Sequence, residues 1–472
     1  MDPSLTLSPA DYGLLTDLYE LTMAACYVGE GIHQQPASFE VFVRQLPEGF
    51  GYLVAAGLDQ VLDYLTHFHF SAERLQQLQD TGIFDHAPEQ FWSLLRQAEF
   101  TGDLWAVPEG TAVFGHEPLL RVDAPLWQAQ IVETYLLNSI NYQTLVATRA
   151  AQMRDVAGER ATLLEFGSRR AFSPQASIWA ARAAIAGGMD ATSNVLAALK
   201  LGEKPSGTMA HALVMAISAL RNSEDAAFTA FLKYFPDSAL LIDTYDTLEA
   251  VDRLVERAKA GMEIKAVRLD SGDLVALSQA VRSRLPGVAI VASGDLDAPE
   301  IARLRQAGAE IDGYGVGTKL VTGQPVNGVY KLVEIGGIPV MKGSAGKKMW
   351  PGRKQVFRRV DERGQLQGDR LGLMEEAAEP GETPLLKRVM QAGQRLHAEP
   401  LSQISERTRQ TLRSLPDVVR RAHSPGFSPR ISDALQAVEQ RTQSRISSRY
   451  TEAKHANSGH TDSRHTDSKP VS

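Results

Sequence analysis

The run AVRLDSGDL at Ala266–Leu274 places charged side chains at the end of an apolar stretch. Residues two apart in a strand share a face, so we expect Arg268 and Asp270 to point the same way. Ser271-Gly272 follows at once and opens a loop. This arrangement suits a clamp for a charged substrate. A buried arginine–carboxylate pair that only fixes a turn has the same pattern, and this run alone does not separate the two.

Polar and glycine residues also follow the neighbouring apolar runs. These runs end in Glu165-Phe166-Gly167-Ser168-Arg169-Arg170, Asp190, Asp243-Thr244-Tyr245-Asp246, Ser293-Gly294-Asp295 and Gly313-Tyr314-Gly315-Val316-Gly317-Thr318. Glycines let backbone N–H groups approach an anion, and the helices expected after them add the attraction of their dipoles. The two glycine loops therefore predict a phosphate site, to which Thr318 adds a hydroxyl donor.

The acidic residues of this set suit a phosphorylated sugar. Asp295 can accept hydrogen bonds from a ribose diol, although an aspartate here could instead cap a helix. Asp243 and Asp270 can hold a hydrated magnesium ion or steady a developing positive charge. Ring faces and cations for a flat anionic ligand are offered by Phe166, Tyr19, Arg169, Arg170 and Arg268. Tyr19 also fits an ordinary half-buried tyrosine.

One histidine stands apart, in the run PSGTMAHA that precedes the apolar segment LVMAISAL. An imidazole held by a carboxylate can act as a nucleophile toward phosphorus, and acidic strand ends are expected near His211. A histidine just before a hydrophobic helix is more often structural. The residues alone leave both interpretations open.

The alternation of short apolar runs and helix-length segments predicts how these residues are positioned. It continues from Thr162 to Val316 and is typical of parallel βα units. We favour a barrel, because polar groups recur at the carboxyl ends of nearly every strand and those ends meet at one mouth in a barrel. The expected fold class is α/β: an irregular α/β barrel with an N-terminal mixed α/β domain and a small C-terminal domain.

The patterning divides the chain into four parts. Residues 1–125 are expected to form the mixed domain, with a helix over Leu14–Gly29 and a half-buried strand over Ala37–Arg44. Residues 126–325 form the barrel, which is entered through one long helix at Leu126–Arg154. Residues 326–445 are strand-rich and then helical, and pack back on the first domain. Residues 446–472 are expected to be a disordered tail, because low apolar content cannot offset the entropy of ordering.

Composition excludes several function classes. A chain of 472 residues is too long for one ordinary hydrophobic core, so two or three domains are expected. A net charge of −7 gives no reason to expect nucleic-acid binding. A single cysteine, Cys26, excludes an internal disulfide framework and a cysteine-rich metal site. No run approaches the ~18 consecutive apolar residues of a membrane span, and the first residues lack the features of a secretory signal. We therefore expect a cytoplasmic protein without nucleic-acid or membrane partners.

Nine runs carry a resemblance to a known family. In order, from about residue 13 to 360, they are LLTDLYELTM, FEVFVRQLP, EFGSRRAFSP, GGMDATSN, PSGTMAHA, LIDTYDTLEA, VRLDSGDL, SGDLD and GYGVGTKLVT. On these runs the chain resembles nicotinate phosphoribosyltransferases. The resemblance implies that nicotinate and phosphoribosyl pyrophosphate give nicotinate mononucleotide and pyrophosphate, a step of NAD biosynthesis. It further implies coupled hydrolysis of ATP as a co-substrate, a requirement for Mg²⁺, and a homodimer with shared active sites.

Matching positions then imply a role for each site residue. His211 matches the histidine that ATP phosphorylates transiently, although Ala212 follows it where serine is expected. In this reaction the departure of pyrophosphate leaves a positively charged ribose carbon, which Asp243 and Asp270, as catalytic carboxylates, can stabilise electrostatically. The nicotinate site is implied to comprise Tyr19 of the partner subunit, Phe166, Arg169, Thr208 and Arg268. The phosphoribosyl and phosphate groups are implied to bind Arg44, Asp190, Ser293, Gly294, Asp295, Gly315, Gly317, Thr318 and Lys331, with Arg44 and Lys331 reaching across the dimer.

Three alternatives have the same general plan. A nicotinamide phosphoribosyltransferase would take the amide, but the GSRR and MAHA runs favour the acid. A quinolinate enzyme needs a denser basic pocket for two carboxylates and has no use for His211. A catalytically silent nucleotide-binding scaffold would not need every expected polar position to be filled.

Overall fold

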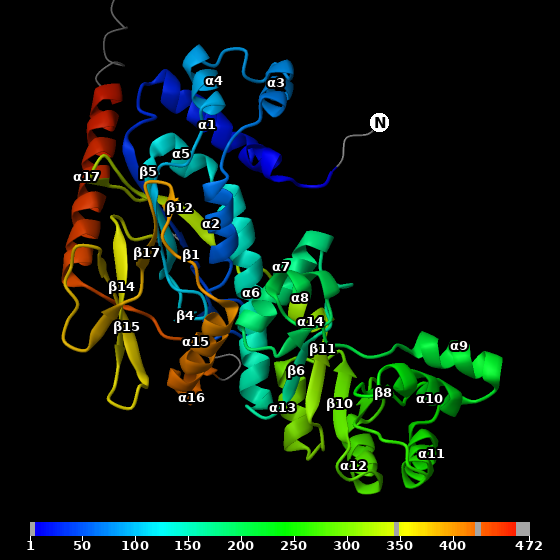
Figure 1. The fold of residues 1–472 in the computed structure, drawn as a ribbon. Coiled ribbons are helices and arrows are strands. Elements are labelled where there is room, and N and C mark those ends of the chain that lie inside the picture. The colour runs from blue at the N-terminus through cyan, green and yellow to red at the C-terminus, as the bar shows by residue number, and fades with distance from the viewer. Residues whose placement is uncertain (1–4, 344–348, 421–425, 459–472) are drawn as a thin grey trace, which may run out of the picture.

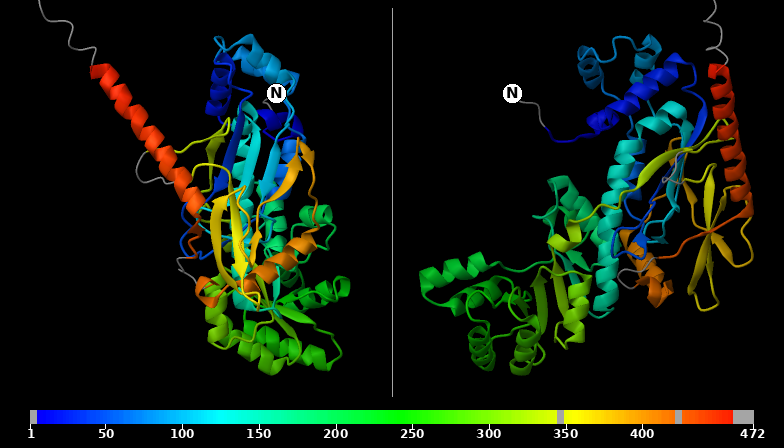
Figure 2. Two further views of the ribbon diagram at one scale, coloured as in Figure 1. Left: turned by 90° about the vertical axis from the view of Figure 1, so that its left-hand side faces the viewer. Right: turned by 180° about the vertical axis from the view of Figure 1, so that it is seen from behind.

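The computed structural model describes residues 5–343, 349–420 and 426–458. Its two main parts are a mixed α/β domain at one end and a domain built on a parallel sheet at the other, joined by one long helix (Figure 1). The two further views keep these domains at opposite ends of the molecule (Figure 2). The α/β class is therefore confirmed.

The first part of the chain contributes mainly helices on one side of an antiparallel sheet. Its helical segments are η1 (Pro9–Leu14), α1 (Leu18–Gly29), α2 (Leu58–Thr66), α3 (Ala72–Asp80) and α4 (Glu89–Arg96). Its strands are β1 (Pro36–Phe42), β2 (Leu53–Val54), β3 (Asp103–Ala106), β4 (Ala112–Val113) and β5 (Pro118–Pro125). Helix α1 begins four residues later than predicted, because Asp17 is its extended N-terminal cap residue and the preceding turn is 3₁₀. Strand β1 is buried on both faces rather than on one.

The predicted long helix is two helices. Helix α5 (Leu126–Ile131) ends at Val132, and α6 (Glu133–Ala157) continues from there along the molecule. Buried residues lie on every side of α6, so it forms part of the core of both domains.

The second domain is an open sheet of six parallel strands in the described residues. The strands are β6 (Thr162–Glu165), β7 (Ala191–Thr192), β8 (Leu240–Leu241), β9 (Ala266–Leu269), β10 (Ala289–Gly294) and β11 (Gly313–Val316), in the order β7-β6-β11-β10-β9-β8. The helices around them are α7 (Pro174–Ala186), α8 (Val195–Leu201), α9 (His211–Arg221), α10 (Glu224–Tyr234), α11 (Thr247–Lys259), α12 (Leu274–Arg284), α13 (Ala298–Gln306) and α14 (Thr318–Val321). The sheet does not close into a barrel, because its edge strands β7 and β8 are only two residues long and do not pair with each other.

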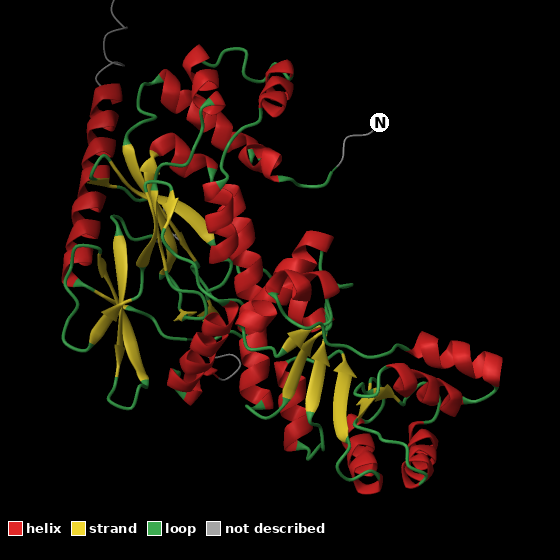
Figure 3. Cartoon of the chain, in the orientation of Figure 1, coloured by secondary structure: helices red, strands yellow, loops and turns green. Residues whose placement is uncertain are grey.

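The last part of the chain returns to the first domain. Its strands are β12 (Val329–Ile335), β13 (Ile338–Pro339), β14 (Lys354–Val360), β15 (Leu366–Leu373), β16 (Glu382–Pro384), β17 (Lys387–Gln391), β18 (Gln394–Arg395) and β19 (Arg430–Ile431), and its helices are α15 (Leu401–Ser414), α16 (Asp417–Arg420) and α17 (Asp433–Ser458). The sheet order β13-β12-β1-β5-β3-β17-β18 shows that this return is by strand pairing. A second sheet, β16-β14-β15-β19, lies beside it (Figure 3).

Helix α17 corrects the prediction of disorder from residue 446. The helix continues to Ser458, one residue before Gly459. Extending an existing helix needs no new nucleus, and this stretch contains good helix formers without glycine or proline. The predicted disorder of residues 459–472 falls outside the described residues. None of the helices in the described ranges combines the length and apolar character that crossing a membrane requires.

Candidate active site

The carboxyl ends of the parallel strands bring most of the predicted residues to one edge of the sheet. Glu165 at the end of β6 is level with Val316 of β11, and Val316 is level with Gly294 of β10. Leu269 of β9 is level with Ala292 of β10, so Asp270 and Ser293 emerge together. Phe166, Asp243, Asp270, Ser293, Gly294 and Gly317 all follow or end a strand at this edge.

Asp243 and Asp270 form a carboxylate pair in which one oxygen of each is held in place. Asp243 Oδ2 accepts hydrogen bonds from the Asp270 backbone N–H at 2.9 Å and the Ser271 hydroxyl at 2.8 Å. Asp270 Oδ1 accepts one from the Ser293 hydroxyl at 2.5 Å. Asp243 Oδ1 is buried without a hydrogen-bond partner among the described residues. Such an orphaned acceptor is costly unless a ligand supplies a donor or a cation.

His211 is the first residue of α9 and faces this pair. Its Nδ1 lies 3.2 Å from the Thr244 hydroxyl, and its Nε2 lies 3.9 Å from Asp270 Oδ2. The side chain is 39% exposed. The hydroxyl orients the ring, and the imidazole remains open to a ligand in solution. The structure thus brings His211 to the strand ends, as the sequence predicts.

Arg268 is a partly buried cation beside the same carboxylates. Burial lowers the pKa of its guanidinium, Asp270 and Asp243 oppose this shift, and the nearby Arg169 lowers the pKa further. Its Nε has no hydrogen-bond partner within the described ranges. Two neighbouring cations with a spare donor are suited to bind a carboxylate or a phosphate.

The glycine loops make room for Phe166 and for the Asp270 backbone. A Cβ at Gly315 would overlap the Phe166 ring. Gly294 has φ +115°, and a Cβ there would lie 2.9 Å from the Asp270 carbonyl oxygen. Gly317 precedes Thr318, the first residue of α14, and both are partly exposed. Any side chain at Gly294 or Gly315 would therefore disturb a predicted binding residue.

Asp295 lines an open pocket of about 480 Å³ together with Asp270. The helix that follows is capped by Asp297, whose side chain accepts the Glu300 N–H at 2.9 Å. The capping alternative for Asp295 is thus wrong, and its exposed carboxylate remains available to a ligand.

Two predicted residues have structural partners of their own. The Thr208 hydroxyl donates to the Ala239 carbonyl, which fixes the segment before His211 against the start of β8. Asp190 accepts hydrogen bonds from the Leu163 N–H at 2.7 Å and from Arg154 at 2.5 Å. Asp190 precedes β7 and bonds to the first half of β6, so it lies at the amino end of the sheet. Its assignment to the phosphate site is contradicted by this position.

Tyr19 and Lys331 lie in the other domain, around Glu133. Burial, followed by the charge of Glu133, raises the pKa of Tyr19. Burial also raises the pKa of Glu133, and Lys331 opposes that shift. Tyr19 is 45% exposed on α1, which lies in the first domain, away from the parallel sheet (Figure 1). Within one chain, neither residue reaches His211.

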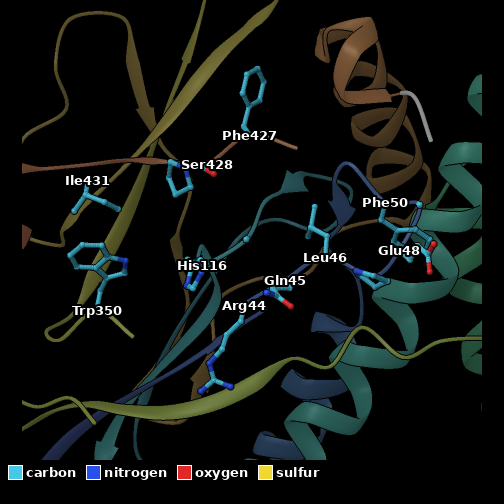
Figure 4. A pocket seen from close by; sticks show the side chains of 14 residues that line it. Arg44, Gln45, Leu46, Glu48, Phe50, His116, Trp350, Phe427, Ser428 and Ile431 are labelled. Carbon is cyan, nitrogen blue, oxygen red and sulfur yellow. The ribbon is translucent and has the colours of Figure 1, made fainter. Parts of the chain in front are cut away.

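Arg44 lies in the same domain but in a different place. It follows β1 and lines a pocket of about 590 Å³ with His116 and Trp350 (Figure 4). Its guanidinium lies 5.9 Å from the Phe42 ring centroid, and its Nε has no hydrogen-bond partner among the residues the structure describes.

The described residues fit a magnesium ion only if substrate phosphates and water supply most of its ligands. No group of three or more His, Cys, Asp or Glu side chains that could hold a metal occurs in the described ranges. Magnesium commonly uses one or two carboxylates and takes its other ligands from substrate phosphates and water. Asp243, whose Oδ1 has no hydrogen-bond partner among the described residues, and Asp270 can supply these one or two carboxylates.

Sequence reasoning assigned no role to Thr244 and Ser271, which hold His211 and Asp243. Both directly follow a predicted catalytic aspartate, in DTYD and LDSGD. Their position next to these aspartates could have marked them as site residues. One sequence does not show, however, that Thr244 contacts His211 or that Ser271 contacts Asp243.

Comparisons with known proteins agree with this geometry. Residues 14–141 match the nicotinate phosphoribosyltransferase (NAPRTase) N-terminal domain, and residues 161–360 match the nicotinate phosphoribosyltransferase (NAPRTase) family. A nicotinate phosphoribosyltransferase of Mycobacterium tuberculosis is 43% identical over 428 residues, which cover 88% of this chain and 90% of the relative. One of Bacillus subtilis is 42% identical over 382 residues, which cover 77% of this chain and 76% of the relative.

Solved structures give the same result. The structure of human nicotinic acid phosphoribosyltransferase has a TM-score of 0.77 and 30% identity, covering 90% of this chain and 99% of that chain. A nicotinate-nucleotide pyrophosphorylase from Pyrococcus furiosus has a TM-score of 0.71 at 24% identity, over 88% and 99% of the two chains, which shows a shared fold.

Proposed function

The chain belongs to the nicotinate phosphoribosyltransferase family, and from that premise we propose that its strand-end site couples nicotinate phosphoribosyl transfer to ATP hydrolysis through His211. The chain is an enzyme of NAD biosynthesis that joins nicotinate to a phosphoribosyl group. The proposal concerns the roles of the individual residues, the use of ATP and Mg²⁺, and the sharing of the site between two copies.

In the transfer step the nicotinate nitrogen forms a bond to C1 of the ribose as the bond from C1 to pyrophosphate breaks. Positive charge develops on the sugar in between. Asp270, 3.9 Å from His211 Nε2, and the adjoining Asp243 carry negative charges at fixed positions, and preplaced charges of this kind stabilise a transition state without reorganisation. The hydrogen bonds from Ser271 and Ser293 keep both carboxylates in position.

Arg268 and Arg169 are proposed to bind the nicotinate carboxylate, with the Phe166 ring on one face of the pyridine. The spare Nε donor of Arg268 supports this role, because an arginine can hold a carboxylate through two parallel bonds. Thr208 lines the same pocket in this proposal. Nicotinamide, the substrate of the alternative enzyme, is neutral and would gain less from two cations.

The phosphoribosyl group is proposed to lie along Ser293, Gly294, Gly315, Gly317 and Thr318. The tight approach of these backbones to Asp270 and Phe166 would put the phosphate and the base on adjacent parts of one edge. Asp295 would accept hydrogen bonds from the ribose hydroxyls. Mg²⁺ would supply positive charge to the departing pyrophosphate, next to Asp243 and Asp270.

The position of His211 carries the proposal of ATP coupling. Its imidazole is oriented by Thr244, partly exposed, and next to the carboxylate pair that serves the transfer. In the proposed step a ring nitrogen forms a bond to the γ-phosphorus of ATP while the bond to ADP breaks, and the ring proton is lost. Water later releases the phosphate. A phosphohistidine adds about two negative charges beside Arg268, which would change the affinity of the site for its substrates.

A second copy of the chain is proposed to complete the site. Tyr19, Arg44 and Lys331 lie in the first domain, away from the strand ends of their own chain. Exposed apolar side chains precede Tyr19 in the chain and also occur on α8 and on α9, which begins with His211: Leu15, Leu18, Val195, Leu196, Leu199 and Met215. Exposed apolar surface of this kind favours association. Tyr19 of a second copy would then stack on the free face of the nicotinate ring.

The use of ATP as a co-substrate favours a cytoplasmic location.

The test is a steady-state assay of nicotinate mononucleotide and ADP formation with Mg²⁺, with and without ATP. We expect ATP to raise turnover of the wild type, and His211→Ala to abolish this effect and ADP formation while it keeps a slow basal transfer. Tyr245→Phe, at an exposed neighbour of Thr244, is the control and should respond to ATP like the wild type. A His211→Ala enzyme that still hydrolyses ATP in step with transfer would refute the role of His211.

The dimer is tested by mixing two inactive variants, Tyr19→Ala and Asp270→Asn. Mixed dimers contain one site with both native residues, so activity should return on mixing. Persistent inactivity of the mixture, with exchange of subunits shown by a tag, would refute the shared site.

A further inference from the structure

A second pocket lies next to residues 315–323, which we call the phosphate loop, on the side where α6 packs against α13. It has a volume of about 700 Å³ and is formed by the loop at 48–50, helices α6, α13 and α16, and Lys319 of α14. This volume is in the range of ordinary small-molecule sites, ~300–1,000 Å³. None of the roles proposed above uses it.

The floor of this pocket is apolar. Phe50 is 8% exposed and Met153 is 1% exposed, and Val156, Pro299 and Ala302 add further apolar surface. These residues come from both domains, so the floor is fixed by the packing of α6 against α13. A ring-sized apolar group would be removed from water here.

The charges around the floor are unevenly paired. At one end Arg420 forms ion pairs with both Asp155 and Asp417, so that end has no free cation and one carboxylate charge in excess. At the other end Arg149 forms no ion pair within the described residues. Lys319 reaches only Asp297, at 3.9 Å. Burial lowers the pKa of Arg149, and the charge of Asp297 opposes that shift. Arg149 and Lys319 therefore carry two positive charges against the single carboxylate of Asp297 at this end, and the remaining lining carboxylate, Glu48, is exposed on the loop at 48–50.

Arg149 also holds the phosphate loop. Its Nη1 donates to the Lys319 carbonyl at 2.8 Å, and its guanidinium lies where a Cβ of Gly323 would be. It thus contacts both ends of α14, which begins with Thr318. On the other wall, Asp297 and Pro299 line both this pocket and the one that contains Asp270 and Asp295. The two pockets share the first turn of α13.

We propose that this pocket binds a small molecule with one anionic group, a carboxylate or a phosphate, on a ring-sized apolar body, and that its occupancy alters the binding of phosphoribosyl pyrophosphate. The anionic group contacts Arg149 and Lys319, and the body lies over Phe50, Met153 and Ala302. Because the anion engages the residue that holds α14, it changes the phosphate loop more than the nicotinate pocket. Such coupling is reciprocal: the phosphoribosyl ligand must change the affinity of the second ligand by the same factor.

The binding claim is tested with a fluorescent probe of this chemistry, anilinonaphthalene sulfonate, and with phenylnaphthylamine, a neutral analogue that lacks the sulfonate. We expect saturable binding of the sulfonate at one site per chain. Ala302→Trp fills the pocket and should weaken that binding by about tenfold or more. Ala258→Trp, at an exposed alanine of α11 outside the pockets described above, is the matched control and should bind the probe like the wild type.

A second variant separates charge from shape and remains informative if Ala302→Trp does not fold. Arg149→Gln can still donate to the Lys319 carbonyl but lacks the positive charge. It should weaken binding of the sulfonate several-fold and leave the neutral analogue unchanged. Equal effects on both probes, or probe binding that neither variant changes, would overturn the proposal. So would an absence of saturable binding because a second copy covers the pocket.

The coupling claim rests on the proposed function of the phosphate loop, and its failure is distinguishable because probe binding is measured without turnover. Addition of phosphoribosyl pyrophosphate should shift the probe titration of the wild type, and nicotinate alone should not. In the assay, saturating probe should change KM for phosphoribosyl pyrophosphate more than KM for nicotinate, and this effect should disappear in Arg149→Gln. Probe binding that is insensitive to phosphoribosyl pyrophosphate refutes the coupling.

Discussion

The Thr244 hydroxyl is the hydrogen-bond partner of His211, so its loss should affect the chemistry of the histidine and little else. Thr244→Val keeps the shape of the side chain and removes the 3.2 Å contact to Nδ1. A neutral hydrogen bond contributes ~0.5–1.5 kcal/mol, which corresponds to about a 2- to 13-fold change in rate. Because the imidazole is 39% exposed, water can replace the lost partner, and we expect the lower part of this range, about 2- to 5-fold.

The assay measures nicotinate mononucleotide and ADP in the same reaction, with and without ATP. Thr244→Val should lower the ATP-stimulated rate and ADP formation together and leave the basal transfer unchanged. Thr244→Ser restores a hydroxyl and should recover the stimulated rate. A parallel measurement of KM for ATP separates orientation of the nucleophile, which lowers kcat, from a loss of ATP binding.

Three results would refute the reasoning. If basal and stimulated rates fall by the same factor, Thr244 supports the loop after β8 as a whole rather than the histidine. If Thr244→Ser behaves like Thr244→Val, the hydroxyl is not the relevant group. An unchanged stimulated rate in both variants would show that the ring needs no such partner.

Three further expectations follow from close packing and buried charge. Gly315→Ala adds a methyl group that overlaps the Phe166 ring, so the Phe166 side chain must leave its preferred rotamer. Such a forced rotamer costs ~0.5–1.5 kcal/mol. KM for nicotinate should therefore rise about 2- to 13-fold in steady-state assays. Burial raises the pKa of Glu20 to about 8 from its ordinary 4.5; the folded state then keeps a proton that the unfolded state loses, so stability falls as pH rises through this window, and Glu20→Gln should gain Tm over the wild type from about pH 5 to 8. Arg182→Met leaves Glu109, its bidentate partner at 2.7 and 2.9 Å, buried and unpaired, which should lower the free energy of unfolding by ~3–5 kcal/mol in urea titrations.

Each of these expectations has a control or a contrary result. Gly29→Ala, where a Cβ meets nothing nearer than 3.6 Å, should leave KM unchanged. A wild-type Tm that does not change over this pH range would contradict the raised pKa of Glu20. So would a Glu20→Gln variant whose gain in Tm over the wild type is the same at both ends of the range. An Arg182→Met, Glu109→Gln double variant should recover part of the lost stability, because no charge is then left unpaired and the amide oxygen can still accept the Gly57 N–H. No recovery would contradict the assignment.

Local pattern predicted well where the strands end and which residues follow them. The apolar run Ala266–Leu269 forms β9 with the predicted bounds, and Asp270 follows it at the common edge. This success has a simple cause, because in parallel βα units the residue after each strand is at the same edge whatever the detailed packing. Glycine positions were informative for the same reason, since a missing Cβ at Gly294 and Gly315 is required by neighbours from other strands.

The failures concern information that is not local. The sequence pattern places Asp190 among the strand ends. In the structure it precedes β7, and its partner Arg154 comes from helix α6, far from it in the chain. Asp295 and Asp297 are two residues apart and both precede α13, and the structure shows that Asp297 caps the helix. Closure of the sheet could not be inferred from strand order, because it depends on the length of the edge strands.

The strand order of the first sheet determines when that sheet can form during synthesis. Strands β1, β3 and β5 are flanked by β12 and β17, whose residues leave the ribosome after the whole parallel-sheet domain. At ~5–20 residues per second, β5 waits roughly 15–50 s for β17. During that interval two sheet edges are unpaired and available to nascent chains of the same kind or to a chaperone. The parallel-sheet domain has no strand from outside residues 162–316, so it can complete its own sheet while the first sheet still waits for β12 and β17.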